Sequence, residues 1–132
     1  MDVSKIKLCI EHIFPDIIKD VNYYLYDKGN INDIFIGNWN YPQPQPTQSE
    51  LKSAYLQVLE KGKWQEIRKK RNDLLLKHEW MVIRHVTQKA LGITPKLTAE
   101  QYTRLLTYSQ ELRDIPQKYS NPDDVVFPVE PT

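Results

Sequence analysis

Three prolines at alternate positions, in the stretch YPQPQPTQSE, limit what this chain can fold into more than any other feature. A proline lacks a backbone N–H and has a fixed φ, so this stretch favours an extended polyproline-II path that neither pairs in a sheet nor continues a helix. Regular structure must therefore stop before the stretch and start again after it. The pattern predicts a proline-rich linker over residues 42–47, although a short segment of this kind is also typical of a ligand for an SH3-type domain.

The residues before the linker predict a small helix-plus-hairpin unit over residues 1–41. Apolar residues from Val3 to Phe14 recur at helical spacing, and a proline ends the run. Strand-forming residues then occupy Asn22–Asp27 and Asp33–Trp39, on either side of a turn in which Gly29 can take a positive φ. We expect a β-hairpin with the helix packed on one of its faces.

The residues after the linker, 48–132, predict an α-helical region. Thr47 and Glu50 have the spacing of a capping box, which starts a helix, and Gly62 is a natural stop or kink for that helix. A second helix is predicted from Trp64 to Lys77, and the stretch that follows favours a further short helix. This region is expected to contain a helical hairpin.

A second capping box, at Thr98, starts the last predicted helix, and Pro116 is expected to close it. Beyond Tyr119 the acidic stretch NPDDVVFPVEP contains prolines that exclude a central strand, and we expect it to fold back over the helical hairpin or onto a partner. The fold class is therefore α+β: a helix plus β-hairpin, a proline-rich linker, and an α-helical hairpin with an extended tail. The expected inner face of the last helix is Tyr102, Leu105, Leu106 and Leu112.

The composition is that of an ordinary globular protein and narrows the classes of function. Lysine and arginine (18) nearly balance aspartate and glutamate (17), and the net charge of +1 argues against a general polyanion binder. No stretch approaches the roughly 20 apolar residues of a membrane span, so we expect no membrane association. The single cysteine, Cys9, lies on the first predicted helix and is interpreted as a buried thiol, as expected for a protein kept in a reducing cytoplasm.

The sequence contains no recognisable catalytic pattern. Its histidines, His12, His78 and His85, have no metal-ligand spacing, and the single cysteine has no partner ligand. We interpret the histidines as surface or capping residues. The sequence therefore predicts a protein that is not an enzyme, with no catalytic, cofactor-binding or metal-binding residues and no small-molecule substrate.

The run KGKWQEIRKKR is the most concentrated charge in the chain, with six lysines and arginines against one glutamate. A basic helix that carries an aromatic residue can bind nucleic acid. We favour a solvated helix face whose charge is compensated by the acidic residues near the end of the sequence. A related hypothesis is a charge network that joins two helices through Arg71, Asp73, Arg113 and Asp114.

The second half of the chain contains, in this order, RKKRNDLLLKHEW, LTAEQYTRLLTYSQELRDIP and VVFPVEP. Together these stretches resemble the phage tail assembly chaperone family, which is related to tail fibre assembly proteins. The resemblance covers roughly residues 64–131, and the first half of the chain fits more loosely. The residues that match the family pattern are Arg71, Asp73, Leu74, Leu75, Glu79, Trp80, Leu97, Thr98, Gln101, Tyr108, Gln110, Leu112, Arg113, Asp114, Ile115 and Pro116.

This resemblance implies a phage-encoded protein in the host cell cytoplasm that binds a tail fibre, spike or baseplate protein and assists its folding or assembly, without catalysis. An alternative is a permanent structural adaptor of the virion tail, baseplate or fibre. A third class, a nucleic-acid-binding regulator, rests only on the basic run. Aromatic residues are good anchors for a partner, but they also fill small cores. The candidate partner-binding or structural residues are Trp64, Arg71, Asp73, Trp80, Tyr102, Tyr108, Arg113, Asp114, Pro116 and Phe127.

Overall fold

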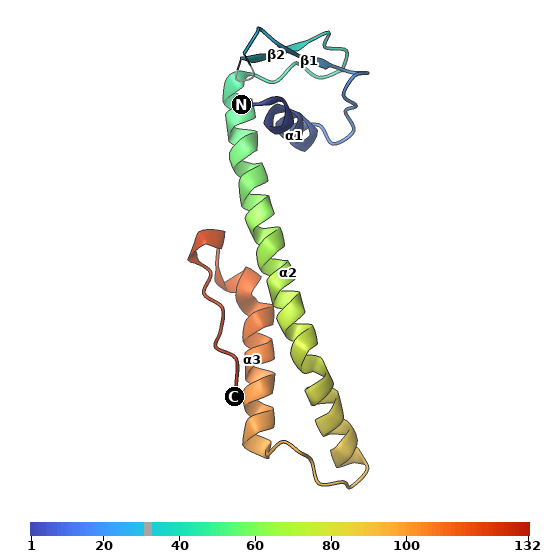
Figure 1. Cartoon of the computed structure of the whole chain (residues 1–132), viewed down its shortest axis with the longest axis vertical. Coiled ribbons are helices and arrows are strands. Elements are labelled where there is room, and N and C mark those ends of the chain that lie inside the picture. The colour runs from blue at the N-terminus through green and yellow to red at the C-terminus, as the bar shows by residue number, and fades with distance from the viewer. Residues whose placement is uncertain (31–32) are drawn as a thin grey trace. The chain divides into compact units, whose positions relative to one another are not determined.

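The computed structural model describes residues 1–30 and 33–132. These residues form two compact units, unit 1 (Met1–Gly62) and unit 2 (Lys63–Thr132). The mixture of helices with one antiparallel hairpin confirms the predicted α+β class, and the domain boundaries expected on either side of residues 42–47 stay a prediction. Figure 1 shows the elements, which are α1 (Val3–Ile13), β1 (Tyr24–Asp27), β2 (Ile34–Gly37), α2 (Gln48–Ala90), α3 (Ala99–Lys118) and a 3-10 helix, η1 (Pro122–Asp124).

Unit 1 contains the predicted hairpin. β1 and β2 pair in an antiparallel register that places Tyr24 opposite Gly37, and both strands are shorter than predicted. Gly29 has a φ of 87°, as expected for the turn, while the part of the predicted turn at residues 31–32 lies outside the described residues.

The core of unit 1 joins α1, the hairpin and the first turns of α2. The Asp2 carboxylate caps α1 by accepting a hydrogen bond from the backbone N–H of Lys5 at 2.9 Å. Cys9 is buried as predicted, and burial raises the pKa of its thiol. Because α2 supplies two of the core residues, its first turns are part of unit 1. The core residues are Ile6, Cys9, Ile10, Ile17, Tyr23, Ile34, Leu51 and Ala54.

α2 is one continuous helix of 43 residues, so the predicted stop or kink at Gly62 is wrong. A glycine inside a helix costs only about 1 kcal/mol relative to alanine, and the helix-forming residues on both sides outweigh that cost. A glycine ends a helix when it adopts a left-handed conformation. Gly92, with a φ of 69°, has that conformation just beyond the last residue of α2.

The first capping box is present as predicted. The backbone N–H of Glu50 donates to Thr47 Oγ1 at 3.2 Å, and the backbone N–H of Thr47 donates to Glu50 Oε2 at 2.7 Å. These hydrogen bonds, first to the backbone and then to the side chain of Thr47, lower the pKa of the Glu50 carboxyl. The box therefore defines where α2 begins.

The second capping box is also confirmed, but the end of α3 differs from the prediction. Gln101 donates its backbone N–H to Thr98 Oγ1 at 3.1 Å and accepts from the backbone N–H of Thr98 at 2.9 Å. Pro116 does not close the helix, which continues to Lys118 and ends with a bond from the Tyr119 N–H to the Ile115 carbonyl. A proline in the last turn removes one donor, whereas the residues after it can still complete their own bonds.

The inner face of α3 agrees only in part with the prediction. Leu105 and Leu112 are buried as expected, whereas Tyr102 is half-buried and Leu106 is exposed. The buried face lies further along the helix because the core of unit 2 forms around its second half. The buried residues of α3 are Leu105, Tyr108, Ser109, Leu112 and Ile115.

The segment after α3, residues 119–132, is here called the tail. It reverses direction and runs back beside α3 (Figure 1), so it folds over the helical hairpin, as one of the two expectations for it stated. Three tail residues, Tyr119, Val125 and Phe127, pack on the core residues Tyr108, Leu112 and Ile115. The same core residues contact Trp64, Ile67, Leu74 and Leu75 of α2.

Candidate partner-binding surfaces

The tail is held along α2 by three lysines that are spaced seven residues apart. An α-helix has about 3.6 residues per turn, so side chains at this spacing lie on one face. Each lysine contacts a different tail residue in sequence order. The contacts are Lys63 Nζ to Asp123 Oδ1 at 2.9 Å, Lys70 Nζ to the centroid of the Phe127 ring at 4.2 Å, and Lys77 Nζ to Glu130 Oε2 at 3.1 Å.

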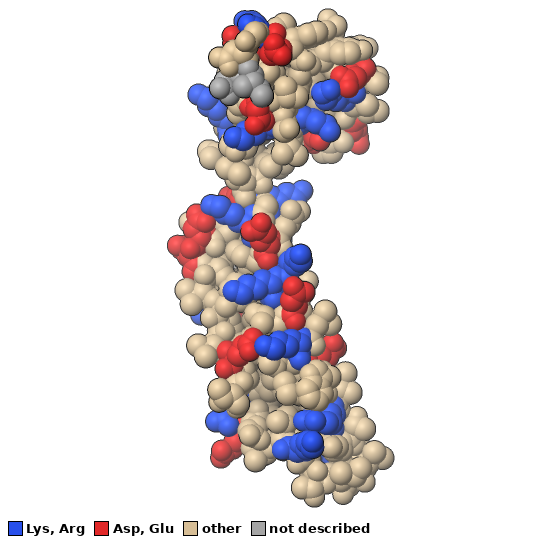
Figure 2. Space-filling view, in the orientation of Figure 1, with Lys and Arg blue, Asp and Glu red and all other residues tan. Residues whose placement is uncertain are grey.

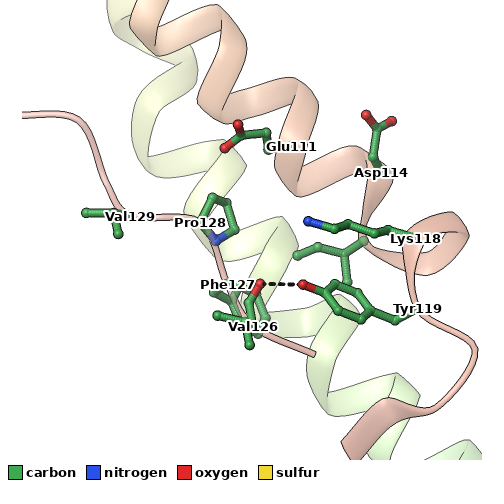
Figure 3. Close-up of a pocket in the computed structure, with 9 residues that line it drawn as sticks. Glu111, Asp114, Lys118, Tyr119, Val126, Phe127, Pro128 and Val129 are labelled. Atoms are coloured by element: carbon green, nitrogen blue, oxygen red, sulfur yellow. Dashed lines mark hydrogen bonds between the residues drawn. The ribbon is translucent and has the colours of Figure 1, made fainter. Parts of the chain in front are cut away.

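The two ion pairs are solvent-exposed, and exposed pairs of this kind contribute about 0–1 kcal/mol each. Within the tail, the Tyr119 hydroxyl donates a hydrogen bond to the Val126 carbonyl at 3.3 Å (Figure 3). Between the tail and the last turns of α3 lies a pocket of about 420 Å³. Figure 3 shows that its lining includes two acids and one lysine, namely Glu111, Asp114 and Lys118.

Contacts within unit 2 account for much of the basic run. Lys63 and Lys70 contact the tail, and the Arg68 guanidinium lies 5.8 Å from the centroid of the Trp64 ring. The compensation expected from Asp114, Asp123 and Asp124 is thus confirmed for one pair, Lys63 with Asp123. On the face drawn in Figure 2, lysine and arginine side chains alternate with acidic ones along unit 2. This arrangement favours the structural interpretation of the run over nucleic-acid binding.

The charge network predicted around Arg71 does not form. Arg71 donates from Nε and Nη2 to Oδ1 of the neighbouring Asn72, at 3.2 and 3.1 Å. Asp114 accepts a hydrogen bond from Gln110 at 2.9 Å instead. Within residues 1–30 and 33–132, no ion pair includes Arg71 or Arg113. Asp73 is exposed. It does not face Arg71, because residues two apart on a helix do not share a face.

The other side of the helical hairpin carries a groove that the tail does not line, here called the open groove. Its volume is about 420 Å³, and its apolar walls come from both helices. Glu79 and Arg113, one acid and one base, lie among its polar residues, so the groove combines an apolar surface with both signs of charge. The apolar lining residues are Leu75, Leu76, Val82, Ile83 and Leu106, and the polar ones are Asn72, Glu79, Ser109 and Arg113.

An exposed apolar stripe runs along α2 at this groove. Leu76, Trp80 and Ile83 follow the i, i+4, i+7 spacing of one helix face, and all three are exposed, with Leu76 at 66% and Trp80 at 56%. The Arg84 guanidinium lies 4.8 Å from the centroid of the Trp80 ring. Contiguous exposed apolar surface of this kind marks sites of protein–protein interaction.

Two histidines occupy the interface between α2 and α3, so their predicted surface or capping role is wrong. His85 stacks on Tyr102 with ring centroids 3.9 Å apart, and His78 meets Tyr108 edge to face at 5.3 Å. Both histidines are buried. Positions 74, 78, 81 and 85 follow helical spacing from the inward-facing Leu74, and this signal places the histidines on the buried face. His12 lies in unit 1, where Nε2 is 2.8 Å from the side-chain oxygen of Gln57.

The sequence-predicted residues separate into three groups. Trp64, Tyr108 and Phe127 come together in the core of unit 2, while Trp80 and Arg113 lie on the surface near or in the open groove. The remaining five do not form one site. Arg71, Tyr102 and Pro116 are half-buried, and Asp73 and Asp114 are exposed.

The open groove contains residues that sequence reasoning missed, above all Leu76, Ile83 and Leu106. Leu106 was assigned to the inner face of α3, and the other two were assigned to no surface. The signal that could have identified them is that α2 carries two apolar faces, one through Leu74 and one through Leu76. The packing of α3 covers Leu74 and leaves Leu76 exposed.

Over the described ranges, no three histidine, cysteine, aspartate or glutamate residues gather where they could hold a metal ion. In the same residues, no helix combines the length and apolar content that a membrane span needs. The helical hairpin has one face that its own tail covers and one apolar groove that the tail does not line. An exposed apolar groove of this kind is typical of proteins that bind other proteins.

Comparison with known families gives this class a specific identity. The model of the phage tail assembly chaperone protein family matches residues 64–132, just over half of the chain, and this match begins one residue after the start of unit 2. The chain belongs to the phage tail assembly chaperone protein family, and its role is in bacteriophage tail assembly. The XkdW protein family model matches residues 6–69. No curated protein and no solved structure matches the chain significantly.

Proposed function

We propose that this protein binds a tail fibre protein in the cytoplasm of the infected host and assists its folding or assembly, without catalysing a reaction. The observation that carries the proposal is the open groove, which lies within the residues that match the chaperone family. An unassembled fibre chain exposes apolar surface that it later buries against other subunits. An apolar groove that covers such surface would hold the chain in a form competent for assembly.

The groove has the features of a helix-binding site. Two helices form its walls, and an amphipathic helix of the partner can insert apolar residues at i, i+3 and i+4 spacing between them. Leu76 and Ile83 offer apolar contact area, and Trp80 next to them is the residue type most enriched among energetically dominant interface residues. Glu79 and Arg113 can orient the partner, since charges around an interface set specificity and register more than affinity.

The test is refolding of the tail fibre protein encoded by the same phage, with and without the purified chain. We expect the chain to raise the yield of assembled fibre, measured by size-exclusion chromatography with light scattering. The substitution Leu76→Glu places a charge in the open groove and should weaken binding roughly tenfold or more. Leu56→Glu is the matched control, because Leu56 is 67% exposed on α2 but belongs to unit 1 and is not among the residues that line the groove.

An unchanged yield with Leu76→Glu, or an equal loss with Leu56→Glu, would exclude the groove as the binding surface. If spike or baseplate proteins bind in place of the fibre protein, the partner assignment changes and the groove assignment stands. Mass spectrometry of purified virions against infected-cell lysate separates chaperone from adaptor. We expect the protein in the lysate and not in virions, whereas a fixed copy number per virion would identify a permanent structural part.

A further inference from the structure

The surface beneath the tail has the composition of a peptide-binding groove, here called the tail groove. Ile67 of α2 and Phe127 of the tail line one pocket there, and Ile67 and Trp64 both pack on the core of unit 2. Lys63, Lys70 and one acid, Glu66, also line this pocket, and Lys77 continues the row of lysines along the same face of α2. A row of cations beside an apolar floor suits a ligand that carries both acidic and aromatic side chains.

The tail itself shows which ligand pattern fits. From Asp123 an aromatic residue follows four positions later, at Phe127, and a second acid follows three positions after that, at Glu130. Each of the three meets one of the lysines. The segment beyond η1 contains neither helix nor strand, and Val125 at its start has extended backbone angles. The tail thus meets the lysine row as an extended segment, through three side chains at fixed spacing.

Side chains hold the tail far more than its backbone does. In the part of the chain that the structure describes, the backbone of residues 126–132 makes one hydrogen bond, from the Tyr119 hydroxyl to the Val126 carbonyl. No backbone ladder links the described segment to either helix, and its two lysine ion pairs are exposed to solvent, while Glu130 also lies 4.0 Å from Nε2 of the buried His78. The core contacts between α2 and α3 are made by other residues, so the hairpin can keep them when the tail leaves.

We propose that the tail groove is a binding site for an extended segment of a partner protein, with an acid, an aromatic residue and a second acid at the spacing of Asp123, Phe127 and Glu130. In the free protein the tail occupies this site and competes with the partner. The apparent association constant for the partner is then the intrinsic constant multiplied by the fraction of molecules in which the groove is open. The inference rests on the proposed function only where it identifies the partner as a phage tail protein.

The test uses a fluorescent peptide with the sequence of residues 120–132, titrated with the full-length chain and followed by fluorescence anisotropy. The full-length variant Asp123→Asn/Glu130→Gln keeps Phe127 but loses the two lysine ion pairs of its own tail, and with them the negative charge that Glu130 places 4.0 Å from His78 Nε2. Its groove should open more often, so it should bind the peptide roughly 2- to 30-fold more tightly than the natural chain. A peptide with Phe127→Ala should bind neither protein.

Charge reversal tests whether the lysine row makes the site. The variant Lys63→Glu/Lys77→Glu should lose the peptide, and a peptide carrying Asp123→Lys and Glu130→Lys should recover binding to this variant. The matched control is Lys69→Glu/Lys89→Glu, which makes the same change in net charge. Among the described residues, neither Lys69 nor Lys89 makes an ion pair with the tail, so this control should bind the original peptide normally.

Several results would overturn the proposal. One is failure of the peptide to bind the variant with the loosened tail, and another is binding that Lys63→Glu/Lys77→Glu leaves intact. Displacement of the peptide by a single-stranded oligonucleotide would assign the lysine row to nucleic acid. A dimer that excess peptide dissolves would identify the occupant as the tail of a second copy. The peptide titration contains no fibre protein, so its failure leaves the proposed function intact. Failure of the refolding test, in turn, leaves the peptide result intact.

Discussion

The Lys70 ammonium nitrogen lies 4.2 Å from the centroid of the Phe127 ring, a cation–π contact that fixes the tail against α2. Phe127 also packs on the core formed by Tyr108, Leu112 and Ile115. One tail side chain therefore links the charged rim of the helical hairpin to its apolar core. This double contact explains how a segment with few backbone hydrogen bonds keeps a defined path.

Phe127→Ala should destabilise unit 2. Fully buried phenylalanines cost about 3–5 kcal/mol when truncated to alanine, and the half-buried Phe127 should cost about 2–3 kcal/mol in the free energy of unfolding. Lys70→Met should cost less, about 0.5–1 kcal/mol, because it removes only the cation–π contact. Urea denaturation measures both. Val129→Ala is the control, since Val129 is 91% exposed, and an equal loss for this control would contradict the anchoring role.

Replacing either of two glycines by alanine should change the stability in opposite directions: Gly62 lies inside α2, and Gly92 lies just beyond its last residue. Gly62 lies inside the helix, and a Cβ there would meet nothing within 4 Å, so Gly62→Ala should stabilise by about 0.5–1 kcal/mol. Gly92 has a φ of 69°, where an L side chain is strained, so Gly92→Ala should destabilise by about 1 kcal/mol. Thermal unfolding followed by circular dichroism compares the two. Destabilisation by Gly62→Ala would mean that the helix does not run through this position.

Local signals predicted the parts of the fold that depend on neighbouring residues. Each capping box is complete within four residues, and both helix starts, at Thr47 and Thr98, agree with the structure. Gly62 and Pro116 misled because a single unfavourable residue competes with the summed propensity of a long helix. A breaker residue therefore predicts a helix end poorly when it stands alone, and a capping pattern predicts a start well.

The surfaces were harder to predict, because they depend on contacts between distant residues. The ion pair of Lys63 with Asp123 joins positions 60 residues apart, and the sequence predicted acids of the tail as partners of the basic run without assigning this pair. Likewise, α2 has two apolar faces, and only the packing of α3 decides that Leu74 is covered while Leu76 stays exposed. The expectation that the acidic tail folds back and compensates the basic run pointed in this direction, and the seven-residue spacing of the three lysines is a further signal that the sequence analysis did not use.

Tyr23 should make unit 1 sensitive to alkaline pH. Burial, and then the charges of Glu11 and Asp20, raise the pKa of its hydroxyl to about 12. An unfolded tyrosine ionises near pH 10, so the unfolded chain loses this proton first as the pH rises. The stabilising contribution is thus complete below about pH 10 and is lost as the pH rises towards about 12.

Tyr23→Phe should remove this part of the alkaline destabilisation, which is measured as the free energy of unfolding between neutral and alkaline pH. At neutral pH the variant should be as stable as the natural chain or slightly more stable, because the buried hydroxyl has no hydrogen-bond partner among the described residues. Tyr24→Phe removes an exposed hydroxyl and is the control. Identical pH profiles for both variants would show that Tyr23 does not carry the effect.

The two tryptophans of unit 2 that the sequence marked as site residues should separate binding from stability. Trp80→Ala should leave the free energy of unfolding within about 0.5–1 kcal/mol of its natural value, since it removes an exposed ring and one cation–π contact. The same change should weaken binding of the fibre protein roughly tenfold, because Trp80 extends the apolar stripe beside the open groove.

Trp64→Ala should show the opposite pattern, with a loss of about 2–4 kcal/mol in stability, because Trp64 packs on the core of unit 2. Circular dichroism gives the stability of each variant, and surface plasmon resonance on immobilised fibre protein gives its affinity. A stable Trp80→Ala protein that binds as tightly as the natural chain would remove the stripe from the binding surface. Binding would then have to be sought at the tail groove, where the peptide titration measures it directly.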